Sequence, residues 1–236
     1  MPRNAEKNEE VRECRKKQIL DAALNVYIRY GYHAADMDFI AKEAKLAKGL
    51  MYYYYKTKNE LFKELLTLMF NEGYTLSNAI LENLKGLNPV EQLMMYTYKM
   101  FLANRDNPRM MQFYMRVPFD AFAIIGADQW KEGAEKSDLH RKTLTDIIKK
   151  GITVGVIQET NPSSAANSFW SVFVANVFEY SKMMTGKQEP INIDTDIFRN
   201  VVKFCFQGLG IEYKVWNSCL ENIVLQNKNG NNNENI

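Results

Sequence analysis

The stretch from Asp36 to Leu61 reads DMDFIAKEAKLAKGLMYYYYKTKNEL, and its pattern decides the fold of the first third of the chain. Ile40 and Ala44 would share one face of a short helix. Met51 and Tyr55 would share one face of a second helix. Two short helices joined by a three-residue break are typical of a helix-turn-helix, which can place its second helix in the major groove of DNA.

The other side chains of the second helix would point outward, and they combine a cation with phenolic hydroxyl groups. They are Lys48, Gly49, Leu50, Tyr52, Tyr53 and Tyr54. The four successive tyrosines cannot all face inward, because each step along a helix turns by about 100°. We therefore expect at least two of them on the surface, where such groups suit phosphates and base edges.

Helices are expected on both sides of this motif. The first carries apolar side chains at helical spacing from Ile19 to Tyr30 and ends at Gly31, a usual terminating residue. The second starts with the capping-box pattern of Thr57 and Glu60. It is long enough to leave one domain and enter another, and we expect it to be the only covalent connection between them.

The rest of the chain predicts a bundle of helices. Asn-Pro pairs at 88–89, 107–108 and 161–162 each place a capping asparagine before a proline at the first helical position. Pro118 predicts a break in the helix that starts near Pro108, and Asp194 or a neighbour should cap the last main helix. No stretch alternates with the period of a strand, so the predicted fold class is all-α.

These patterns suggest four segments. We expect a flexible N-terminus at 1–11, a helix-turn-helix domain at 12–72 with its motif at about 36–55, a second domain at 73–215, and a C-terminal extension at 216–236. The asparagine-rich end, residues 226–236, has almost nothing to bury, and we expect it to be disordered.

Charge and cysteine content narrow the possible functions. Residues 1–63 carry 13 Lys and Arg against 9 Asp and Glu, whereas residues 64–236 carry 17 against 19, so the positive charge lies with the motif. Three cysteines without a Cys-x-x-Cys spacing argue against a disulfide framework or a zinc site and favour the cytoplasm. No signal peptide or membrane span is indicated.

The motif resembles the TetR family of one-component bacterial regulators. The family pattern has Gly-Tyr at the end of helix 1, Ile-Ala in helix 2, and Gly-x-Leu/Met-Tyr-x-x-Phe/Tyr-x-x-Lys-x-x-Leu from helix 3 onward. The matching residues are Gly31, Tyr32, Ile40, Ala41, Gly49, Leu50, Met51, Tyr52, Tyr55, Lys58 and Leu61. The match covers about residues 12–72, and the remainder resembles the family only in the number, order and length of its helices.

The resemblance implies a three-helix DNA-binding domain joined to a helical domain for ligand binding and dimerisation. It also implies phosphate contacts for Tyr52, Tyr54 and Lys58, and base contacts for Lys48, Gly49, Leu50 and Tyr53. Lys48 could reach guanine O6 or N7.

Four residues of the motif depart from the family pattern: Ala35, Asp36, Lys45 and Ala47. Asp36 can still cap helix 2, but Asp36 and Asp38 place negative charge close to the expected phosphates. Lys45 must take the turn without the conformational freedom of glycine. Ala47 offers no side-chain cap to helix 3, a loss of about 1 kcal/mol.

Aromatic residues of the second domain suit either a pocket for a flat or hydrophobic ligand or an ordinary core. The candidate ligand-binding residues are Tyr98, Phe101, Phe113, Tyr114, Arg116, Phe122, Phe169, Phe173 and Tyr180, with Asp120 as a further polar group. The helix at 162–184 is apolar over so much of its circumference that it needs cover on more than one side. That cover would come from the core of a monomer or from a second subunit, and the resemblance implies that the last two main helices build a dimer interface. The candidate dimerisation residues are Trp170, Val174, Phe198, Val201, Val202 and Cys205.

We find no catalytic constellation, metal motif or cofactor motif, so an enzyme is disfavoured. The expected function is a homodimeric transcriptional regulator, a repressor that binds double-stranded operator DNA and is released by a hydrophobic or aromatic small molecule. The alternative is a small-molecule-binding helical bundle with weak or lost DNA binding, for which Asp36, Asp38 and Ala47 are the supporting residues.

Overall fold

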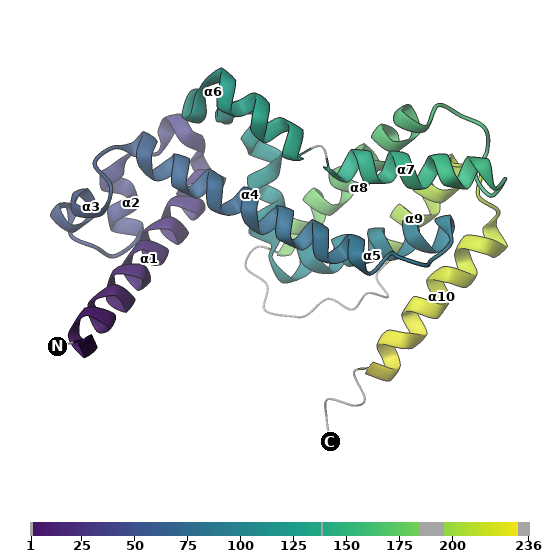
Figure 1. Ribbon diagram of the computed structural model, residues 1–236, viewed down its shortest axis with the longest axis horizontal. Helices are drawn as coiled ribbons and strands as arrows, with labels where there is room; N and C mark the ends of the chain where they lie inside the picture. Colours follow the sequence, from purple (N-terminus) through teal and green to yellow (C-terminus); the bar gives the residue numbers. More distant parts are fainter. Residues whose placement is uncertain (1, 138, 185–195, 231–236) are drawn as a thin grey trace. The chain divides into compact units, whose positions relative to one another are not determined.

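The computed structural model describes residues 2–137, 139–184 and 196–230, which form ten α-helices (Figure 1). These described residues contain no strand, so the predicted all-α class is confirmed. By their internal contacts the helices make two compact units. Unit 1 is Met1–Gly73 with Gln112–Ala134, and unit 2 is Tyr74–Met111 with Glu135–Ile236.

Unit 1 begins with the predicted helix-turn-helix. Its helices are α1 (Pro2–Ala34), α2 (Met37–Glu43), α3 (Lys48–Tyr54) and the first part of α4 (Lys58–Glu82). α2 packs against α1 and against α3, at the purple end of the chain in Figure 1. Buried side chains from all four helices form the core, among them Ile19, Tyr27, Ile40, Met51 and Leu61.

α1 starts at Pro2, so residues 2–11 of the segment expected to be flexible are helical. The segment is polar, but its glutamates, lysines and arginines are good helix formers, and proline suits the first helical position. An ion pair joins Arg12 and Glu9, one turn apart. The helical backbone is interrupted at Gly31, with φ 79° and ψ 173°, a conformation open almost only to glycine. The predicted end of the first helix at Gly31 is therefore confirmed.

α6 (Pro108–Ser137) contributes its central part to unit 1, although the sequence analysis assigns those residues to the second domain. The Tyr114 hydroxyl donates to the Met69 carbonyl over 2.8 Å. The Asn59 amide donates to the Ile124 carbonyl over 2.7 Å. The chain therefore passes between the units along α6 as well as along α4, and α4 is not the only covalent connection.

The break predicted at Pro118 lies elsewhere. α6 continues through Pro118 and leaves the helical conformation at Gly126, where φ is 77° and ψ is 172°. A proline removes one backbone donor from a helix, and α6 accommodates this loss. Only a residue without a Cβ takes the positive φ at Gly126 easily.

Unit 2 is a bundle around two central helices. Its helices are α5 (Pro89–Asp106), α7 (Leu139–Thr153), α8 (Pro162–Met184), α9 (Asp196–Gly208) and α10 (Tyr213–Gly230). α8 packs against α5, α7 and α9, and α5 also packs against α7, α9 and α10. The helices of this bundle therefore cover α5 and α8 from several sides.

The predicted starts of α5, α6 and α8 at their prolines are confirmed. The Asn88 side chain accepts hydrogen bonds from the N–H groups of Val90 and Glu91. The Glu91 carboxylate in turn accepts a hydrogen bond from the Asn88 N–H. The Asn161 side chain accepts from the Ser164 N–H over 2.9 Å. The cap expected at Asp194 lies outside the described residues.

α10 is a helix that the sequence analysis does not predict. Its apolar side chains recur at helical spacing and are buried: Trp216, Leu220, Ile223 and Val224. The helix packs against α5 and continues to Gly230, so the first part of the tail expected to be disordered is helical. Residues 231–236 lie outside the described residues.

Candidate nucleic-acid interface

The turn between α2 and α3 is held from both sides. The Asp36 carboxylate accepts from the Phe39 N–H over 2.6 Å and caps α2, as predicted. The Leu46 N–H donates to the Ala41 carbonyl over 2.9 Å and closes the turn. Lys45 has a φ of 55°, which confirms that a residue other than glycine takes the left-handed conformation there.

Burial of two side chains fixes the rotation of α3. Met51 and Tyr55 are buried, as predicted. Their burial turns the opposite face of the helix outward. Lys48, Gly49 and Leu50, which precede Met51 in the helix, are exposed.

The tyrosines divide as the sequence analysis expects. Tyr52 and Tyr53 are 37% and 69% exposed, so at least two of the four lie on the surface. Tyr54 is half-buried and meets the Tyr53 ring edge-on, with 5.3 Å between the ring centroids. Ala47 precedes α3 without a side-chain cap, also as predicted.

Lys48 has a partner that the sequence analysis did not identify. Its ammonium lies 2.6 Å from a carboxylate oxygen of Asp38, in the first turn of α2. The hydrogen bond and the charge of Asp38 raise the pKa of Lys48. The same ammonium lies 5.9 Å from the centroid of the Tyr52 ring. The cation expected to face the bases is therefore held between an acid and an aromatic ring.

Lys58 is half-buried at the start of α4. Its ammonium donates to the Tyr32 carbonyl over 2.9 Å and to the His33 carbonyl over 3.4 Å. It also lies 4.4 Å from the centroid of the Tyr32 ring. Lys58 therefore ties α4 to the backbone that follows Gly31.

The capping box at the start of α4 is formed in part. The Glu60 N–H donates to the Thr57 hydroxyl over 3.1 Å, as the pattern predicts. The Glu60 carboxylate accepts from the Lys56 N–H over 2.9 Å instead of returning to Thr57. The helix start is nevertheless capped from both directions.

α6 supplies side chains to the same corner of α1. The buried Asp120 carboxylate accepts from the Tyr32 N–H over 3.5 Å. A Cβ at Gly31 would lie 2.5 Å from a guanidinium nitrogen of Arg116, which is the end of a flexible side chain and could shift, so the positive φ of Gly31 is the stronger reason for glycine. Burial, and next the charge of Asp120, raise the pKa of Tyr27. Arg116 and Asp120, predicted as polar groups for a ligand, instead contact the end of the first helix.

The candidate ligand-binding residues are divided between the two units. Phe113, Tyr114, Arg116 and Phe122 belong to unit 1, and Tyr98, Phe101, Phe169, Phe173 and Tyr180 belong to unit 2. Phe113 is buried against the rings of Tyr27 and Phe70, whereas Phe122 is exposed. The four residues of unit 1 are thus parts of the helix-turn-helix unit or of its surface.

In unit 2, rings from α5, α8 and α9 form an aromatic cluster. The Phe101 ring lies 5.1 Å from the Tyr180 ring and 5.0 Å from the Phe198 ring, between centroids. Tyr98 meets Phe198 at 6.0 Å. Farther along α8, Phe169 contacts Phe206 and Phe173 contacts Trp170.

Two buried polar atoms beside this cluster lack hydrogen-bond partners within the described part of the chain. They are the Asn104 side-chain oxygen and the Tyr180 hydroxyl. The Asn104 amide nitrogen donates to the Val177 carbonyl over 3.4 Å, which places Asn104 against α8. Burial raises the pKa of Tyr180, and the charge of Arg105 opposes this effect. A single asparagine in a helix belongs to no recognisable sequence motif, so the role of Asn104 could not be predicted from the sequence.

The four dimerisation candidates on α9 are not on the surface. Phe198, Val201, Val202 and Cys205 are buried within the chain itself. Burial raises the pKa of the Cys205 thiol to about 12. These residues belong to the core of unit 2 because α9 turns its strongly apolar face toward α8 and α5.

Other side chains of the two helices remain accessible. Trp170, Val174 and Phe178 follow one another at intervals of four along α8, and each is half-buried. On α9, Phe204 is 66% exposed. We refer to these four residues as the α8–α9 apolar face.

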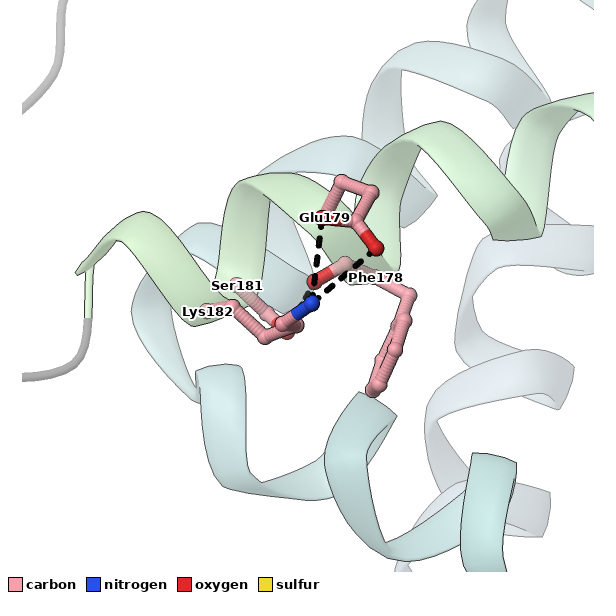
Figure 2. A network of polar contacts seen from close by, with 4 residues as sticks. All are labelled: Phe178, Glu179, Ser181 and Lys182. Carbon is pink, nitrogen blue, oxygen red and sulfur yellow. Dashed lines mark hydrogen bonds and ion pairs between the residues drawn. The ribbon is translucent and has the colours of Figure 1, made fainter.

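Polar contacts hold the last turn of α8 beside this face, as Figure 2 shows. The Lys182 ammonium lies 3.1 and 3.2 Å from the two carboxylate oxygens of Glu179. It also lies 5.4 Å from the centroid of the Phe178 ring. The Ser181 hydroxyl donates to the Phe178 carbonyl over 2.7 Å.

Two other kinds of feature are absent from the described residues. Among them, no group of three or more His, Cys, Asp or Glu side chains could hold a metal ion. None of the helices in the described ranges is both long and apolar enough to cross a membrane.

Comparison with known proteins agrees with this geometry. Residues 19–65 match the family model of bacterial regulatory proteins, tetR family. The uncharacterized HTH-type transcriptional regulator YhgD of Bacillus subtilis (strain 168) is 29% identical over 171 residues, which cover 71% of this chain and 85% of that protein. The HTH-type transcriptional repressor KstR of Rhodococcus jostii (strain RHA1) is 27% identical over 132 residues, covering 56% and 60%.

A solved structure shares the fold of most of the chain. The crystal structure of AibR in complex with isovaleryl coenzyme A and operator DNA matches with a TM-score of 0.62 at 16% identity, covering 84% of this chain and 100% of that one. The fold, the exposed face of α3 and the relatives define a DNA-binding transcriptional regulator of the helix-turn-helix class, not an enzyme. Over residues 19–65 the chain carries the N-terminal domain of bacterial regulatory proteins of the tetR family.

Proposed function

We propose that the chain is a homodimeric, ligand-responsive repressor that binds a pseudo-palindromic operator in the cytoplasm. The exposed face of α3 carries the proposal. Burial of Met51 and Tyr55 fixes this helix in one rotation, with Lys48, Tyr52 and Tyr53 outward. A helix of this kind can read base edges in the major groove while hydroxyl groups bind phosphates.

Phosphate contacts are proposed for Tyr52, Tyr54 and Lys58. Lys58 would have to share its ammonium between a phosphate and the Tyr32 carbonyl, which it already contacts. An ammonium has three donors, so both contacts are chemically compatible. Tyr52 is the simpler candidate because its side chain is more than one-third exposed.

Dimerisation is proposed through the α8–α9 apolar face. Half-exposed Trp170, Val174 and Phe178, together with exposed Phe204, place apolar surface where a second copy could cover it. A two-fold dimer would present two α3 helices to successive major grooves, about 34 Å apart. This separation leads us to expect an inverted repeat.

The effector site is proposed in unit 2, at the aromatic cluster of α5, α8 and α9. Buried polar atoms nearly always have hydrogen-bond partners. The Asn104 side-chain oxygen and the Tyr180 hydroxyl have none within the described residues, so a polar group of the ligand could supply hydrogen bonds to both. Phe101 and Phe198 would contact the apolar part of that ligand. AibR was crystallised in complex with isovaleryl coenzyme A, a molecule with both apolar and polar parts.

Selection of duplexes from a random DNA pool by the purified chain tests the proposal. We expect enrichment of an inverted repeat, with binding that weakens steeply as salt rises because phosphate contacts release counterions. Failure to enrich any sequence, with the protein folded and dimeric, would favour the second candidate, a small-molecule-binding bundle. The Asp38–Lys48 contact supports this candidate, since it partly neutralises the cation of α3.

A further inference from the structure

The ion pair between Asp38 and Lys48 needs an explanation other than stability. Both side chains are about half-exposed, at 48% and 64%. Exposed ion pairs contribute little to stability, because water and salt screen the two charges. The neighbouring turn is already held by the Asp36 cap and by backbone hydrogen bonds. The pair therefore adds little to the motif's stability, yet it holds the main cation of the exposed α3 face.

The Lys48 ammonium and the Asp38 Oδ2 that it contacts belong to half-exposed side chains, whereas Asp38 Oδ1 is buried without a hydrogen-bond partner in the described residues. Gly49 is exposed, and a Cβ built on it would meet no atom within 4 Å. The Tyr52 ring lies on another side of the Lys48 ammonium. The ammonium therefore has a carboxylate and a ring as neighbours, and open space beside Gly49 through which a base edge could approach.

The chemistry of the pair matches one base pair. It sets a donor, the ammonium, beside an acceptor, the carboxylate, at hydrogen-bonding distance. In the major groove, guanine presents the adjacent acceptors N7 and O6, and its cytosine presents the N4 donor next to them. Lysine commonly binds guanine there, and aspartate accepts from cytosine N4. Only a G·C pair offers both side chains their preferred partner.

We propose that Asp38 and Lys48 together read one G·C base pair in each half-site, Lys48 donating to guanine O6 or N7 and Asp38 accepting from cytosine N4. This inference rests on the proposed DNA binding and adds Asp38 as a specificity-determining residue. Asp38 brings a negative charge close to the phosphates, which weakens binding to every sequence. In exchange Asp38 adds discrimination between base pairs, because an A·T pair places its N6 donor between its two acceptors and so offers the ammonium no adjacent pair of acceptors.

The test compares selections from one random pool by the full-length wild type, Asp38→Asn, Lys48→Met and the double variant. We expect the wild type to enrich a G·C pair at a fixed position of each half-site. Each single variant should lower that preference roughly five- to hundredfold at the same position. The double variant should lose no more than the stronger single variant, because both residues act on one base pair.

A matched control removes a charge from the same helix. Glu43 lies at the end of α2 and pairs with Arg29 at 3.5 Å. Glu43→Gln should retain the wild-type preference at every position. If Asp38→Asn behaves in the same way and only strengthens binding to all sequences, the charge of Asp38 acts without reading a base and the inference is wrong.

Two other outcomes also overturn the inference. One is loss of preference at different positions in Asp38→Asn and Lys48→Met. The other is a preferred pair other than G·C at the position that both variants affect. A folded wild type that enriches no sequence would instead remove the proposed DNA-binding function itself, so the two failures are distinguishable.

Discussion

Asn104 lowers the stability of the folded chain, and this suggests that its side chain has a functional role. Its side chain is 5% exposed, and within the described chain its oxygen has no hydrogen-bond partner. Leaving a buried acceptor unsatisfied costs about 1–3 kcal/mol. Proteins retain such costs chiefly where function needs the group. This reasoning leads us to place Asn104 in the proposed effector site.

Asn104→Leu should therefore raise the free energy of unfolding of the ligand-free protein by about 1 kcal/mol, because leucine has nearly the same size and no polar atom to bury. Urea denaturation measures this change. Thr97→Val is the matched control on the same helix, since the fully buried Thr97 hydroxyl already donates to the Leu93 carbonyl over 2.7 Å. The control should lose about 1 kcal/mol. A loss of stability in Asn104→Leu would show that this amide has a structural role instead.

At the scale of single helices, the sequence predicted what local patterns encode. The helix-turn-helix, its buried Met51 and Tyr55, and the Asn-Pro helix starts all depend on residues within a few positions of one another. They agree with the structure for that reason. The apolar spacing of α10 was equally local, from Trp216 to Val224, but the asparagine-rich tail obscured it.

Features that depend on distant residues could not be predicted in this way. The Asp38–Lys48 contact joins two helices across a turn, and the unpartnered oxygen of Asn104 is visible only once α8 packs against α5. Burial of Phe198 in the protomer has the same origin. The sequence of an apolar helical face indicates that other side chains will pack against it. It does not indicate whether those side chains come from the same chain or from a second one.

The start of α3 gives a prediction about a helix end. Ala47 has an extended backbone, with φ −65° and ψ 141°, the conformation of a capping residue, yet it offers no oxygen to the free N–H groups of the first turn. Ala47→Ser should raise the free energy of unfolding by about 1 kcal/mol. Thermal unfolding monitored by circular dichroism checks this. Ala47→Val, which adds volume without an acceptor, should not reproduce the gain, and an equal gain from both variants would argue against capping.

At the scale of the whole molecule, DNA binding is proposed for unit 1, and ligand binding and dimerisation are proposed for unit 2. Unit 1 holds the DNA-reading helix, and the central part of α6 belongs to it through contacts with α1 and α4. Unit 2 holds the aromatic cluster and the α8–α9 apolar face. α6 also has residues in unit 2, so it joins the units covalently on either side of that central part. A ligand in unit 2 changes DNA affinity only if it binds one state of the molecule better than another.

The α8–α9 apolar face yields the prediction that tests the assembly. Phe204 is 66% exposed, so Phe204→Glu should leave the protomer folded but place a charge in the proposed dimer interface. Sedimentation should then show a shift from dimer to monomer. Affinity for an inverted repeat should fall roughly 100-fold or more, because the two half-sites would no longer be bound as one linked event.

The control for this experiment replaces another exposed apolar residue of unit 2, one that lies outside the α8–α9 apolar face. Val154, next to the end of α7, is 61% exposed and is suitable. Val154→Glu should keep the dimer and its DNA affinity. If Phe204→Glu also stays dimeric, the interface lies elsewhere on the protein. If it becomes monomeric yet keeps its affinity, the protein reads half-sites independently, and the reason to expect an inverted repeat disappears.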